Sequence, residues 1–243
     1  MGLLIAAGIA TAVALCGFAV LLARSANRVP LVVAFLIALP LQPLVFYLVR
    51  LPVDGLLRTS YGIAGWVAIV SLFYAPLIEE PAKWLTAAMP VVRRAIPKIP
   101  VRIALAAGIG FGIGEIWFLA GALAAAPNYP DLPFWMFGGF ILERLAVCFL
   151  HGAFLTLPFV ALARGRSFWL GGLAGMVLHF LLNFPIYLAQ IDLFGWGAER
   201  WMQTLVLWVV LMTALCAGMV WRLAWRDQLK PTPHKDTPER RAM

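Results

Sequence analysis

Long apolar runs separated by short polar stretches make up most of this 243-residue chain. A helix needs about 20 apolar residues to cross the hydrocarbon core of a bilayer, and each run meets that length. Seven runs can be distinguished, at residues 3–23, 30–49, 61–90, 102–126, 134–163, 167–191 and 201–223. The pattern predicts an all-α polytopic membrane protein with about seven transmembrane helices, in which the third to sixth runs form a catalytic four-helix core.

Composition agrees with this prediction and limits the domain organisation. Hydrophobic residues make up 63% of the chain and charged residues 12%, whereas a soluble domain carries roughly 25% charged residues. We therefore expect one transmembrane helical domain over residues 1–229, with its core at 61–191. Residues 230–243 are rich in proline and charge, which predicts a disordered basic cytoplasmic tail. The run at 3–23 follows no basic residues and can span the membrane, so we interpret it as a retained helix and not a signal peptide.

The chain has a net charge of +8, and its lysines and arginines are spread unevenly over the connections, in a pattern that indicates membrane topology. Lysine and arginine gather in the first, third and fifth connections and in the tail, whereas the even-numbered connections hold only Arg50, Arg58 and Arg200. By the positive-inside rule, the N-terminus lies outside and the C-terminus lies in the cytoplasm, in the plasma membrane of a cell. Short basic clusters between spans do not form a phosphate-binding face, so we expect no nucleic-acid partner. The sequence leaves the oligomeric state open.

Charged and imidazole side chains inside the runs are the candidates for function. An ionised side chain near the bilayer centre costs at least ~2.5–3.5 kcal/mol, so such residues usually serve a function. The third run carries Glu79, Glu80 and Lys83 within one and a half helical turns. The following runs add Glu115, Glu143, Arg144, His151 and His179. We interpret Glu143 as structural or facing water.

Four of these side chains are predicted to lie at one depth in the membrane; they are Glu80, Glu115, His151 and His179. Each is 13 residues from an arginine at the cytoplasmic edge of its run, namely Arg93, Arg102, Arg164 and Arg166 in the same order. At ~1.5 Å per residue, that separation is about 20 Å of helix. Glycines at 108–114 and 171–175 favour close helix approach, which would bring the four side chains together.

Two imidazoles and several carboxylates at one depth are a donor set that suits Zn²⁺. A catalytic zinc takes three His or Glu ligands and leaves one position for water. It lowers the pKa of that water to about 7, and a nearby carboxylate can then act as general base. Lys83 lies four residues after Glu79 and three after Glu80, so its ammonium can neutralise one of the two carboxylates.

The order of the motifs resembles a known family. Successive runs carry Glu79-Glu80-x-x-Lys83, then Phe111-x-x-x-Glu115, then His151, then His179-x-x-x-Asn183. This order resembles the PrsW-like intramembrane proteases, within the wider CAAX-protease and bacteriocin-processing superfamily, over roughly residues 70–190. The resemblance implies a glutamate-dependent, zinc-dependent endopeptidase that cuts a membrane protein or peptide. CAAX-type members carry histidine where Glu115 stands, which argues against prenyl-protein processing.

The resemblance also implies roles for individual residues. Glu79 and Glu80 match the paired glutamates, one of which acts as general base, and Lys83 matches their basic partner. His179 and Asn183 match the last motif, which supplies a ligand and an amide that orients water or stabilises an oxyanion. We therefore expect three zinc ligands, namely Glu115, His151 and His179.

The remaining roles follow from this ligand set. Glu79 would activate the bound water, while Glu80 would orient it or contact the metal. Lys83 and Arg144 would balance the negative charge, and Phe111 would support the site. Which glutamate is the general base stays open.

Two other readings remain open at this point. Intramembrane Glu, His and Lys are also the residues of proton relays, so a non-enzymatic proton or ion transporter is an alternative. A membrane scaffold with the same buried cluster is another. Within the peptidase reading, a metal-free mechanism in which a glutamate alone activates water is not excluded, and the sequence names no substrate.

Overall fold

The computed structural model describes residues 1–61, 65–126 and 131–228. Within these residues every element is helical, which confirms the predicted all-α class. The α-helices are α1 (Gly2–Ala23), α2 (Val29–Val45), α3 (Leu51–Tyr61), α4 (Gly65–Trp84), α5 (Pro90–Ala95), α6 (Pro100–Ala124), α7 (Gly138–Ala163), α8 (Phe168–Gln190) and α9 (Gly197–Gln228). Three short segments of other helix types are η1 (Phe46–Arg50), η2 (Leu85–Ala88) and η3 (Phe134–Phe137). The tail predicted to be disordered, 230–243, lies outside the described residues.

Among the described residues, six helical segments are long and apolar enough to cross a membrane. They are Gly2–Ala23, Val29–Tyr61, Pro100–Ala124, Phe134–Ala163, Phe168–Gln190 and Gly197–Trp225. Their positions agree with six of the seven predicted runs, so the protein is a polytopic membrane protein. The remaining run contains α4, which is 20 residues long but carries Glu79, Glu80 and Lys83. These charges interrupt its apolar character, and α4 is not among the six.

The predicted end of the second run is wrong. We expected a connection after residue 49 that would hold Arg50, but the helix continues through η1 and α3 to Tyr61. Pro40 and Pro43 lie inside α2 and remove two backbone donors from its hydrogen-bond ladder. The π-helical segment η1 follows directly, and a wider turn of this kind re-forms the hydrogen bonds while rotating the residues beyond it.

Glycines on two faces of α6 let its neighbours approach closely. A Cβ at Gly108 would lie 2.0 Å from the backbone nitrogen of Gly152 on α7. On the other face, a Cβ at Gly110 would lie 2.4 Å from the carbonyl oxygen of Phe35 on α2. Gly112 and Gly114 repeat these two approaches one helical turn later. The predicted role of this glycine stretch in close packing is confirmed.

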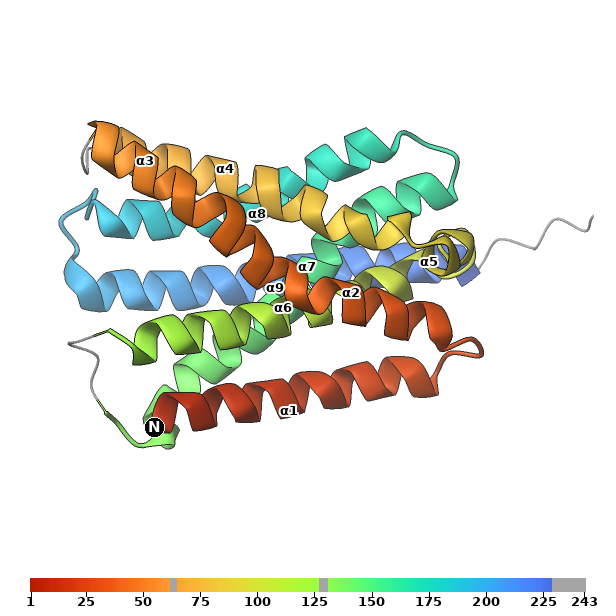
Figure 1. The fold of residues 1–243 in the computed structure, drawn as a ribbon, viewed down its shortest axis with the longest axis horizontal. Helices are drawn as coiled ribbons and strands as arrows, with labels where there is room; N and C mark the ends of the chain where they lie inside the picture. Colours follow the sequence, from red (N-terminus) through yellow and green to blue (C-terminus); the bar gives the residue numbers. More distant parts are fainter. Residues whose placement is uncertain (62–64, 127–130, 229–243) are drawn as a thin grey trace, which may run out of the picture.

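Apolar packing forms two clusters that meet along α7. The larger joins α1, α2, α6 and α7, and the smaller joins α7, α8 and α9. Helix α4 packs mainly against α8, and in Figure 1 it runs between the same two ends of the bundle as α2 and α8. The charged residues of α4 therefore face the interior between α6, α7 and α8.

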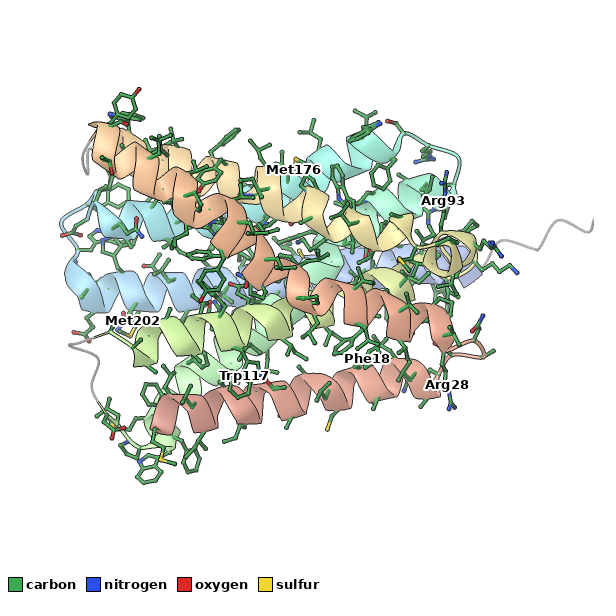
Figure 2. All side chains as sticks on the ribbon, viewed as in Figure 1. Phe18, Arg28, Arg93, Trp117, Met176 and Met202 are labelled. Carbon is green, nitrogen blue, oxygen red and sulfur yellow. The ribbon has the colours of Figure 1, made fainter. Side chains whose placement is uncertain are left out.

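Basic side chains mark one end of the bundle. Arg28 and Arg93 lie at the same end in Figure 2, whereas Met202 lies toward the opposite end. The turn into α2 and the helix α5 meet at this basic end, where α2 contacts α5. The structure thus gathers the positive charge of two connections on one side, as the topology signal predicts.

Candidate functional site

The cytoplasmic half of α4, as the topology prediction orients it, carries three buried charges. The exposed fractions of Glu79, Glu80 and Lys83 are 4%, 1% and 0%. The helix changes to the 3-10 segment η2 immediately after Trp84, and the Thr86 hydroxyl donates to the carbonyl oxygen of Lys83 at 2.7 Å. This bond satisfies one carbonyl at the end of α4 and fixes the backbone of Lys83.

Trp84 anchors this end of α4 on α8. Its indole lies against Gly172, where an added Cβ would meet the ring at 2.4 Å. The same ring packs edge-on against Phe168 and Trp169, with centroid distances of 5.1 and 5.6 Å. Because α8 also carries His179, this contact sets the distance between the carboxylates of α4 and the imidazole of α8.

Glu80 lies at the centre of the cluster. Its Oε1 lies 2.5 Å from the Lys83 ammonium and 2.7 Å from Nδ1 of His179. Phe154 stacks on the His179 ring with a centroid distance of 5.6 Å. Glu80 is therefore the carboxylate that Lys83 neutralises, and one of its oxygens already has two partners.

His151 on α7 joins the centre to a second carboxylate. Its Nδ1 lies 3.1 Å from the Lys83 ammonium, and its Nε2 lies 2.7 Å from Oε2 of Glu115. Phe111 packs edge-on against the imidazole at 4.8 Å and also lies under the Lys83 ammonium, 5.1 Å from ring centre to nitrogen. The predicted supporting role of Phe111 thus takes the form of an aromatic ring that packs beside both Lys83 and His151.

Glu115 and Arg144 form the outer side of the cluster. Nη1 of Arg144 lies 2.7 Å from Oε1 of Glu115, and the same guanidinium pairs with Glu143 beside it on α7. The Glu143 side chain is 41% exposed, in agreement with its interpretation as structural or water-facing. Arg144 balances the charge of Glu115, as expected.

Glu79 has a partner that the sequence did not indicate. Nη1 of Arg50 lies 2.7 Å from Glu79 Oε1, and the Glu79 Oε2 lies 3.7 Å from Nε2 of His179. We had placed Arg50 in a connection, because its apolar run ends there. The sequence carries no signal for a continuing helix at that point, because Pro52 and the Asp54-Gly55 pair that follow are typical of a turn.

Three of the clustered side chains could hold a metal ion. One donor atom each from Glu80, His151 and His179 lies within 4.8 Å of the other two. One carboxylate and two imidazoles are the ligand set of a catalytic zinc site. The carboxylate in this group is Glu80 and not the expected Glu115, whose two oxygens contact Arg144 and His151.

Asn183 is placed one helical turn after His179 on α8 and is half-buried. The other candidate residues from the sequence are joined by the contacts described above, and Arg50 is the addition.

Comparisons with models of protein families, with curated proteins and with solved structures give no match to this chain. The resemblance to PrsW-like proteases rests on the motif residues alone.

Proposed function

We propose that this protein is an intramembrane endopeptidase that hydrolyses a peptide bond of a membrane-associated protein or peptide. The observation that carries the proposal is the convergence of Glu79, Glu80, His151 and His179 inside a helical bundle, from three different helices. Hydrolysis requires a base that activates water and groups that bind the developing charge, and this cluster contains both kinds of side chain.

Glu79 is the general base in this proposal. Glu80 has one oxygen shared by Lys83 and His179, so its position is fixed by two partners. The Oε2 of Glu79 lies 3.7 Å from His179 Nε2, which is beyond hydrogen-bond distance. That oxygen can therefore accept a proton from a water held beside His179. Asn183, one turn along α8, would donate its amide to the carbonyl oxygen of the substrate.

Zinc fits the donor set at the centre. Glu80, His151 and His179 would hold it. Glu115 contacts one nitrogen of His151, and a carboxylate in this position orients a metal-binding imidazole. Such an ion would supply Lewis acidity and a bound water of lowered pKa. The Lys83 ammonium contacts both Glu80 and His151 in the structure. A metal ion that binds these two side chains would therefore compete with the ammonium for them.

The proposed topology has seven spans, with α4 as the third. Its 20 residues give about 30 Å of helix, enough to cross a bilayer core. The buried partners of its charges remove much of the cost that exposure to lipid would bring. With the basic end in the cytoplasm, the N-terminus lies outside.

One observation favours a second candidate function, proton transport. Hydrogen-bond-length contacts run without a gap from Arg144 through Glu115, His151, Lys83 and Glu80 to His179. Chains of Glu and His inside membranes serve as proton relays. The two functions differ in whether a covalent bond of a substrate is broken.

Liposomes that contain the purified full-length protein can separate the two functions. The probe is a pool of quenched-fluorescent single-span peptides that differ in sequence, and a pH dye inside the vesicles reports proton flux. We expect the protein to cleave members of the pool, and Glu79→Gln to slow cleavage at least about 10²-fold, the usual contribution of a general base. Cleavage of no peptide, together with a proton flux lost in Glu80→Gln, would overturn the peptidase in favour of transport.

A further inference from the structure

We propose that Arg50 is a positioning residue for Glu79: it holds one oxygen of this carboxylate so that the other faces His179. The inference rests on the proposed function, because it assigns Arg50 a role in that hydrolysis. It concerns a residue outside the motifs that the sequence indicated.

The contact between the two side chains is direct and shielded. Arg50 Nη1 lies 2.7 Å from Glu79 Oε1, and the exposed fractions of the two side chains are 25% and 6%. A charge-assisted hydrogen bond in such surroundings is stronger and more directional than an ion pair at the surface. With Oε1 held, the carboxylate plane is restricted, and Oε2 is the oxygen on the side of His179.

Arg50 is itself held by α4 through its backbone. The Tyr74 hydroxyl lies 3.0 Å from the carbonyl oxygen of Arg50 and 3.0 Å from Oδ1 of Asp54. Tyr74 and Glu79 are both on α4, so this helix binds both the backbone and the guanidinium of Arg50. Arg50 is also the last residue of the π-helical segment η1, and π-helical turns inside α-helices are frequent at functional sites.

The other buried cations already have partners elsewhere. Lys83 contacts Glu80 and His151, and Arg144 contacts Glu115 and Glu143. Arg50 is the cation that contacts Glu79 among the described residues. A base oriented by a further group is the arrangement found in activated catalytic sites, and here Glu79 is the base and Arg50 is the group that orients it.

The test measures kcat and KM in the liposome assay, on the pool peptide that the wild-type protein cleaves fastest. Arg50→Gln removes the guanidinium charge, Arg50→Lys keeps a cation, and Tyr74→Phe removes the hydroxyl while both charges remain. Arg200→Gln, an exposed arginine at the start of α9, is the matched control. Unfolding temperatures in detergent are measured for every variant.

We expect Arg50→Gln to lower kcat about 10²-fold, the cost of misplacing a reacting group by about 1 Å, with KM within about twofold of wild type. Arg50→Lys should recover part of kcat, because it restores a donor to Oε1. The double variant that combines Arg50→Gln with Glu79→Gln should be no slower than Glu79→Gln alone, because Arg50 acts through Glu79. Arg200→Gln should behave as wild type.

Three results would overturn the proposal: a wild-type kcat in Arg50→Gln, a lower kcat in the double variant than in Glu79→Gln, or no gain in kcat from lysine over glutamine. If Arg50→Gln does not fold, Tyr74→Phe decides, since a loss of kcat at unchanged KM supports positioning and a wild-type kcat contradicts it. A wild-type protein that cleaves no peptide would instead overturn the proposed function itself. The two failures are therefore distinguishable.

Discussion

Lys83 is fully buried and contacts two groups, the Glu80 carboxylate and the imidazole of His151. Its ammonium offsets part of the cost of burying the Glu80 carboxylate away from water. Removing only one member of a buried ion pair leaves the other uncompensated, which costs far more than removing both.

We therefore expect Lys83→Met to lower the free energy of unfolding by about 3–5 kcal/mol, the range found for broken buried pairs. The double variant Lys83→Met with Glu80→Gln should be less destabilised than Lys83→Met alone. Denaturant unfolding in detergent, followed by tryptophan fluorescence, measures both. A double variant less stable than the single one would show that the ammonium stabilises the bundle by packing and not by charge.

Metal content distinguishes the two possible carboxylate ligands. Elemental analysis of purified protein loaded with zinc should find binding abolished in His179→Ala and in Glu80→Ala. Glu115→Gln should retain zinc with affinity lowered about 10–100-fold, because a carboxylate behind an imidazole orients the ligand without touching the metal. If Glu115→Gln abolishes binding and Glu80→Ala retains it, the ligand set expected from the sequence is the correct one. Cleavage by a metal-free preparation would remove zinc from the proposed mechanism.

The sequence predicted which residues meet but not which atoms pair. Counting residues from the basic edges placed Glu80, Glu115, His151 and His179 at one depth, and the structure brings these four together. Depth follows from helical rise alone. The pairing depends also on the rotation of each helix about its axis, which packing sets. Depth alone therefore could not predict that Glu80, and not Glu115, lies within 4.8 Å of donor atoms of both imidazoles.

At the scale of elements, α6 is shaped by its glycines. Four of them alternate between the face toward α7 and the face toward α2, so both neighbours lie against the backbone of α6. This packing fixes Phe111 and Glu115 on α6 relative to His151 on α7. The sequence predicted this close approach, because glycine spacing is a local property. It missed the helical continuation from α2 into α3, because Pro52 and the Asp54-Gly55 pair favour a turn in the local sequence.

Replacing Gly108 should test this packing against a matched control on the same helix. A Cβ at Gly108 would lie 2.0 Å from the backbone of α7, whereas a Cβ at Gly121 meets nothing within 4 Å. We expect Gly108→Ala to lower the free energy of unfolding by about 1–3 kcal/mol or more, the cost of overpacking. Gly121→Ala should be neutral or stabilising by up to about 1 kcal/mol, since alanine is the better helix former. Equal stability of the two variants would contradict this packing of α6 on α7.

At the scale of the whole molecule, basic side chains gather at one end of the bundle, and the proposed topology places this end in the cytoplasm. The connection between α7 and α8 carries Arg164 and Arg166, whereas the connection between α8 and α9 carries Asp192. Opposite accessibility of these two connections follows from the proposed topology.

Cysteine labelling measures that accessibility. In a background with Cys16, Cys148 and Cys216 replaced by alanine, Phe194→Cys should react with a membrane-impermeant maleimide in intact cells. Arg166→Cys should react only after the membrane is permeabilised. Both positions are exposed in the structure, so burial does not limit the reaction. The reverse labelling pattern would place the basic end outside.

The ion pair between Arg50 and Glu79 has a consequence for biogenesis. In the proposed topology the two residues belong to helical segments that enter the membrane one after the other, and each carries a charge whose insertion alone costs about 2.5–3.5 kcal/mol. Lateral release of the first segment into lipid before the second arrives would leave the guanidinium without its carboxylate. We expect the two segments to leave the insertion machinery together as a helical hairpin, with the pair already formed. The same contact that orients the carboxylate would then also set the order of membrane integration.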